Sequence, residues 1–169
     1  MADARRLKPF ILRWEGGFAD DPADRGGATN KGVTIGTFRQ FYGKGASVDD
    51  LKAMTDEQWL HIFREGFWDK WKADGIINQS VANMCVDWAW ASGTVTSIKQ
   101  VQRVVGVKDD GIVGAKTLAA INGSNQRHLH AKIKSARLRF VESIVRRNAT
   151  QRKFLKGWKN RINALTYSE

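Results

Sequence analysis

Residues 79–91, QSVANMCVDWAWA, are apolar around almost the whole circumference of the helix that they predict. A helix without a polar face is typically buried at the centre of a domain. Asp87 is the one charged residue of this stretch and therefore needs a buried partner. It can orient a loop or an arginine near the functional site, and we favour this structural role over a catalytic one. We interpret Cys85, the only cysteine, as a small core residue. The stretch predicts a domain built around one buried helix.

The segments on both sides of this central helix are helical in pattern too. Thr55 and Gln58 form a capping box that starts a helix. Toward the C-terminus, four further helices are predicted at residues 94–105, 114–121, 126–147 and 150–165. Near the N-terminus, apolar residues recur at helical spacing up to Trp14, but Pro9 predicts that this helix is short or begins near Pro9.

One short segment favours a strand. Residues 32–35, GVTI, suit a strand, although Thr34 could equally cap a helix that runs through Phe41. We therefore predict a mainly α chain, α+β at most, with no more than a small β-hairpin. We expect a region at 1–93 and a second helical region at 94–169, packed together as one compact unit.

The composition limits where and how the chain works. A single cysteine cannot form an intrachain disulfide, so we expect synthesis in the cytoplasm. No apolar run is long enough to span a bilayer, and the apolar part of MADARRLKPFILRWEGG is too short for a signal peptide. If the protein acts in the periplasm or cell wall, it needs a holin-like or other non-standard export route.

The net charge of +11 is concentrated near the C-terminus. Residues 123–169 hold 12 basic and two acidic residues, whereas residues 1–122 hold 16 basic and 15 acidic ones. This asymmetry indicates either attraction to a polyanion or a solvated helical face. We find no recognised helix-turn-helix or RNA-binding signature, so we do not expect a nucleic-acid partner. His128 and His130 point to different sides of a helix and no carboxylate stands at ligand spacing, so no metal site is predicted.

Glu15 is the most promising chemical group. It follows Trp14 in the last turn of the first predicted helix, where the helix dipole disfavours an anion and Trp14 and Phe18 can exclude water. Both effects favour the protonated form that a general acid requires. Gly16 and Gly17 leave the approach to the carboxyl group open.

The residues after Glu15 supply partners for acid catalysis. Asp24 offers a second carboxylate and Thr29 a hydroxyl that can hold water, and glycosidases work with such an acidic pair. The alternative is a helix cap followed by a polar surface turn, with Asp24 and Thr29 bonded to local amides.

The ordered run EGGF, then D-P-x-D-x-G-G-A-T-N-x-G-V-T-I-G-T, within residues 15–37, closely resembles the N-terminal signature of glycoside hydrolase family 108. These are bacterial and phage N-acetylmuramidases with a lysozyme-like fold, originally described as secretion activators. The resemblance implies that Glu15 is the catalytic acid. Asp24 and Thr29 are candidates for the second catalytic group, and Asn30, Thr34 and Trp68 are candidates for substrate binding.

The second half resembles a peptidoglycan-binding helical motif that often completes this family. The resemblance rests on Val101-Gln102, Val105-Gly106-Val107, Asp110-Gly111-Ile112, Gly114, Thr117 and Ala120. We favour a structural interpretation over direct ligand contact, because Asp110-Gly111 suits a tight turn and Gly114 with Thr117 suits the start of a helix.

Together these features predict a monomeric, lysozyme-like hydrolase that cleaves the glycan strand of peptidoglycan between N-acetylmuramic acid and N-acetylglucosamine. The basic C-terminal helices would hold it on the anionic cell wall, and no metal or organic cofactor is implied. The rival hypothesis is a non-catalytic peptidoglycan-binding or secretion accessory protein that uses the same fold without turnover.

Overall fold

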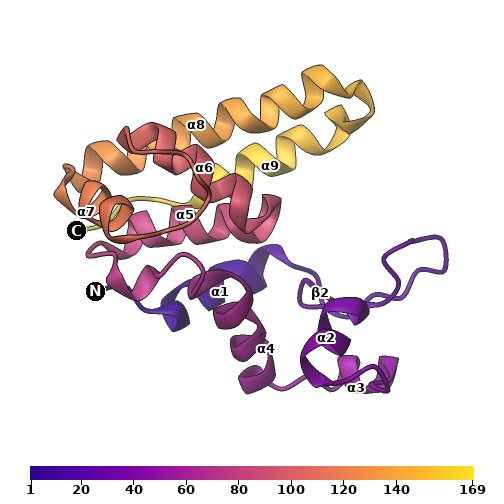
Figure 1. The fold of residues 1–169 in the computed structure, drawn as a ribbon. Helices are drawn as coiled ribbons and strands as arrows, with labels where there is room; N and C mark the ends of the chain where they lie inside the picture. Colours follow the sequence, from indigo (N-terminus) through magenta and orange to yellow (C-terminus); the bar gives the residue numbers. More distant parts are fainter. The chain divides into compact units, whose positions relative to one another are not determined.

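Nine α-helices and one two-stranded antiparallel sheet account for most of the chain in the computed structural model, which describes all 169 residues (Figure 1). The chain is therefore mainly α with a small β-hairpin, as predicted. Its contacts divide it into two units, Ala4–Gly66 and Met1–Asp3 together with Phe67–Glu169. The predicted division at residue 93 stays a prediction. None of the helices combines the length and apolar character needed to cross a bilayer.

The unit Ala4–Gly66 holds the hairpin and four helices. Its elements in chain order are α1 (Ala4–Trp14), β1 (Thr29–Asn30), β2 (Val33–Thr34), α2 (Ile35–Tyr42), α3 (Val48–Lys52) and α4 (Asp56–Phe63). Helices α1 and α4 pack together, and the side chains of Leu7 and Ile11 in α1 and of Trp59, Ile62 and Phe63 in α4 are fully buried. This packing fixes the direction of α1 and therefore the position of its last residue, Trp14, and of Glu15, which follows it.

Helix α1 begins at Ala4 and has 11 residues, so of the two predicted alternatives the short helix agrees with the structure and the start near Pro9 was wrong. Proline removes one backbone donor, the one that would bond to the carbonyl of Arg5. Both Arg5 and Pro9 are exposed, so the ring and the released carbonyl lie on the solvent side of the helix. Burial of Leu7 and Ile11 on the opposite side maintains the helix through the proline.

Capping side chains set the starts of the next helices. Thr34 ends β2 and also caps α2, because its side chain accepts from the amide of Thr37 at 3.1 Å. The two interpretations of Thr34 are therefore both correct. The predicted capping box of Thr55 and Gln58 is present at α4.

The unit that contains Phe67–Glu169 is an all-helical bundle. A π-helical turn, Arg64–Trp68, leads into it and is followed by a 3-10 turn at Ala73–Gly75. Its α-helices are α5 (Gln79–Ser92), α6 (Thr94–Val105), α7 (Ala115–Gly123), α8 (Gln126–Arg147) and α9 (Arg152–Ala164). Helix α5 packs against both α6 and α8, as expected for the apolar stretch at 79–91.

Asp87 of α5 finds its buried partners in two arginines from other helices. Its carboxylate lies 2.8 Å from Nη2 of Arg137 in α8 and 2.7 Å from Nη2 of Arg161 in α9. The side chain of Asp87 is completely buried and that of Arg137 nearly so. The expectation of an arginine partner is confirmed, and the ion network joins three helices. Cys85 is buried beside it, and burial raises the pKa of its thiol.

The motif in the second half forms one hydrogen-bond network around Gln102. The buried amide of Gln102 accepts from the backbone of Gly111 at 2.9 Å and donates to Asp110 at 3.0 Å and Thr117 at 3.2 Å. Gly111 adopts a positive φ of 79°, which favours glycine. These residues therefore hold the α6–α7 connection closed, which supports the structural interpretation of the motif.

Candidate active site

Glu15 directly follows the last residue of α1. Its backbone amide still donates to the carbonyl of Ile11 at 2.9 Å, and its side chain is half-buried. The neighbouring Trp14 has a buried indole N–H without a hydrogen-bond partner, and the centre of its ring lies 6.2 Å from that of Phe10. Gly16 and Gly17 are exposed, and no atom lies within 4 Å of the place where either would carry a Cβ. Glu15 therefore combines partial burial with an uncrowded backbone beside it.

Phe18 continues the chain from the two glycines and contacts helix α3. The ammonium of Lys52, the last residue of α3, lies 5.4 Å from the centre of the Phe18 ring, a cation–π distance. The ring is still 36% exposed, so it screens its surroundings from water only in part. This contact fixes the path of the chain as it leaves Glu15.

The turn-rich segment that follows is a loop closed at its base. Ala19 and Thr29 exchange backbone hydrogen bonds at 2.9 and 2.8 Å, so the nine residues between them form an excursion, drawn beside β2 in Figure 1. Asp24 lies at the middle of this loop, where its carboxylate accepts from the amide of Gly26 at 2.9 Å. Asp24 is exposed. The loop thus returns Thr29, rather than Asp24, to pair with Ala19, which follows Glu15 by four residues.

The hairpin has two chemically different faces. Thr29 pairs with Thr34 and Asn30 with Val33, so the two threonines share one face. Asn30 and Val33 are buried, whereas Thr29 and Thr34 are half-buried. The hydroxyl of Thr34 is occupied with Thr37, but that of Thr29 makes no hydrogen bond within the protein. Thr29 is the one of the pair that can bond a ligand without breaking a contact.

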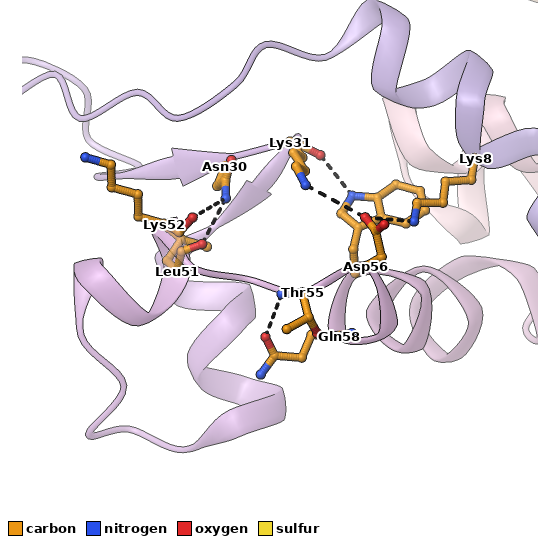
Figure 2. A network of polar contacts seen from close by, with 9 residues as sticks. Lys8, Asn30, Lys31, Leu51, Lys52, Thr55, Asp56 and Gln58 are labelled. Atoms are coloured by element: carbon orange, nitrogen blue, oxygen red, sulfur yellow. Dashed lines mark hydrogen bonds and ion pairs between the residues drawn. The ribbon is translucent and has the colours of Figure 1, made fainter.

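Buried Asn30 attaches the hairpin to α3. Its side-chain amide donates to the carbonyls of Leu51 at 2.9 Å and Lys52 at 3.3 Å, at the C-terminal end of that helix (Figure 2). Helix ends leave such carbonyls without partners inside the helix, so Asn30 satisfies two of them. The sequence predicts a substrate-binding function for Asn30, and in the structure its amide nitrogen is already engaged in this contact.

The turn of the hairpin is attached to α4 and α1. Lys31 and Gly32 both have positive φ, as tight two-residue hairpins require, and the carbonyl of Lys31 accepts from the indole of Trp59 at 3.1 Å. Asp56, in the first turn of α4, lies 3.0 Å from the ammonium of Lys8 in α1 and 3.9 Å from that of Lys31 (Figure 2). The hydrogen bond from Lys8 and the charges of both lysines lower the pKa of Asp56. Helix α1, the hairpin and α4 are thereby held in one arrangement around Glu15.

Removing the amide of Asn30 should loosen this arrangement. We expect Asn30→Ala to lower the free energy of unfolding by about 1–3 kcal/mol, because two carbonyls lose their partner in a buried position. Urea unfolding measures the change, with Asn160→Ala on the exposed face of α9 as control. A loss of stability for Asn30→Ala no larger than that of the control would show that the contact contributes nothing.

Trp68 belongs to the unit that contains Phe67–Glu169, where it is completely buried and its indole donates to Asp74 at 2.7 Å. A ring without exposed surface has no face to offer a sugar, so its burial does not favour the predicted contact with substrate.

Sequence reasoning missed the residues that position the site. The contacts of Lys8, Asp56 and Trp59 join residues between 25 and 48 positions apart, and no local sequence pattern predicts them. Asp56 follows a capping threonine, so its sequence context indicates only a favourable acid at a helix start.

Comparison with known proteins agrees with this geometry. The glycosyl hydrolase 108 family matches residues 8–93, and a predicted peptidoglycan domain matches residues 96–163. No curated protein matches the chain. Solved structures that do match include that of SagA from Brucella abortus, which is 34% identical, covers 96% of this chain and 90% of its own, and superposes with a TM-score of 0.81. The family match spans the end of α1, the closed loop and the hairpin, and the chain belongs to the glycosyl hydrolase 108 family.

Proposed function

We propose that this glycoside hydrolase is an N-acetylmuramidase that cleaves the bond between N-acetylmuramic acid and N-acetylglucosamine, with Glu15 as the general acid. The observation that carries the proposal is the half-buried Glu15 at the end of α1, beside two uncrowded glycines, within the region that matches the family. A carboxylic acid in such a place can protonate the glycosidic oxygen as the bond breaks.

The second catalytic group is proposed among Thr29 and Asp24. Thr29 has an uncommitted hydroxyl at the base of the loop, where it can hold the attacking water or a sugar hydroxyl. Asp24 supplies a carboxylate that would reach the substrate from the loop. Thr34 would contribute through the shape of the hairpin face, because its hydroxyl already caps α2.

The protein would meet its substrate in the periplasm or cell wall after export from the cytoplasm. Helices α8 and α9 carry all 12 basic residues found after residue 122, and their charge would hold a monomer on anionic wall polymer. Attraction of this kind between exposed charges weakens as ionic strength rises.

The identity of the cleaved bond is tested by the products. After digestion of purified peptidoglycan, the new reducing ends are reduced with borohydride, and we expect the reduced form of muramic acid after hydrolysis. Reduced glucosamine in its place would make the enzyme a glucosaminidase and exclude the proposed bond. Heat-inactivated protein is the control for reducing ends already present. The absence of any new reducing end would favour the rival hypothesis of a non-catalytic wall-binding accessory protein.

A further inference from the structure

A groove runs along α8 where this helix packs against α6. Two hollows of about 450 and 310 Å³ adjoin there, and Val104, His128 and Lys132 line both of them. The first continues past Ser135 to Arg139, and the second reaches Asn125 just before α8 begins. At about 1.5 Å per residue, the stretch from His128 to Arg139 is about 16 Å long. The groove is therefore long enough for an extended ligand.

The lining of this groove is basic and contains no acid. His128, Lys132 and Arg139 lie on one side of α8 at helical spacing, and none of the three makes an ion pair in the structure. Acids elsewhere in this unit are already used. Glu142 pairs with Lys159 at 2.8 Å, and Glu169 with Arg127 at 3.2 Å. The groove thus keeps a positive charge that an external anion can neutralise.

The floor of the groove is apolar, which separates it from an ordinary solvated helix face. Val104 and Leu129 lie in the hollows between the basic residues, and Ser135 supplies a hydroxyl. A ligand that fits this pattern carries spaced negative charges on a body with apolar groups. The peptide stems of peptidoglycan, with their free carboxylates and alanine methyl groups, have this chemistry.

We infer that the α6–α8 groove binds the carboxylates of peptidoglycan stem peptides and so holds the wall polymer at a site separate from Glu15. The inference rests on the proposed function, because it takes peptidoglycan as the polymer. It is supported by the location of all residues that line the groove within residues 96–163, the range matched by a predicted peptidoglycan domain. It specifies which of the many basic residues of the C-terminal helices contact the wall.

The test compares two charge-matched double variants in binding to purified peptidoglycan sacculi. Lys132→Gln/Arg139→Gln removes the two permanent cations of the groove, and Arg146→Gln/Arg147→Gln removes two exposed cations at the end of α8. Glutamine is nearly as good a helix former as lysine or arginine. Both pairs are made in the full chain with Glu15→Gln, and binding is measured on ice by sedimentation. We expect the groove pair to bind about 3- to 10-fold more weakly and the control pair to bind within about 2-fold of the parent.

A second variant and a second ligand make the result specific. Ser135→Glu places an acid in the groove with both cations present, and we expect a similar loss of binding. On sacculi whose free peptide carboxylates have been converted to amides, the difference between the groove pair and the parent should disappear. Equal losses for the two charge-matched pairs, or a difference that persists on the amidated sacculi, would overturn the inference. A larger loss on duplex DNA than on sacculi would overturn it in favour of a nucleic-acid ligand. Because binding is measured without turnover, the result can be interpreted even if Glu15 proves not to be the general acid.

Discussion

Replacement of Glu15 by glutamine is expected to lower the rate of peptidoglycan hydrolysis by about 10²–10⁴-fold, the usual contribution of a general acid. Glutamine keeps the size of the side chain and its place after α1 but has no proton to donate. Loss of turbidity of a peptidoglycan suspension measures the rate, and the new reducing ends confirm that it reports hydrolysis. Unchanged clearing by Glu15→Gln would remove Glu15 from the mechanism.

Two matched variants show whether the effect belongs to Glu15. Glu57→Gln makes the same chemical change at an exposed position in the first turn of α4 and should leave the rate unaltered. Asp24→Asn removes a charge from the loop but keeps an oxygen that can accept from the amide of Gly26. A large decrease in rate would therefore make the carboxylate of Asp24 part of the mechanism, and a near-normal rate would leave Thr29 as the candidate second group.

The second large effect concerns stability. We expect Asp87→Asn to lower the free energy of unfolding by about 3–5 kcal/mol, because it leaves two buried or nearly buried guanidinium groups without their counter-charge. The Arg137 side chain is 3% exposed and that of Arg161 13%, so only Arg161 has access to water that would lessen the cost. Urea unfolding monitored by tryptophan fluorescence gives the free-energy difference.

The control for this prediction is an ion pair at the surface of the same unit. Glu142 and Lys159 approach to 2.8 Å, as closely as Asp87 and Arg137, but each side chain is 38% exposed. Glu142→Gln should cost less than about 1 kcal/mol, because water screens the pair. Comparable losses in the two variants would mean that burial does not decide the contribution of Asp87.

The sequence predicted those parts of the fold that depend on local patterns. Helices α6 and α8 have the predicted bounds, Thr55 and Gln58 form the predicted box, and the buried acid of α5 has arginine partners. Each of these follows from periodicity, capping or the cost of burying a charge, which neighbouring residues reveal. The start of α1 was mispredicted because a helix can accommodate a proline on its solvent-exposed face. The sequence around Pro9 does not show which face of the helix is exposed.

The candidate site was less predictable because it depends on contacts between distant segments. Spacing alone grouped Asp24 with Glu15, whereas the bonds between Ala19 and Thr29 return a threonine to the start of the loop. Asn30 is polar and lies in the family signature, which suggested ligand contact, yet its amide holds the end of α3. In a sequence, a polar residue that anchors a hairpin cannot be distinguished from one that contacts a substrate. The distinction requires the surroundings of the residue in the folded structure.

The bonds between Ala19 and Thr29 also separate the length of the loop from the placement of its two ends. They clamp the base of the loop, so the hairpin keeps its place after Ala19 whatever number of residues lies between. Because the entropic cost of closing a loop rises slowly, by about 0.6 kcal/mol for each doubling of its length, insertions in this segment should cost little stability. The fold can therefore accommodate loops of different length at this position.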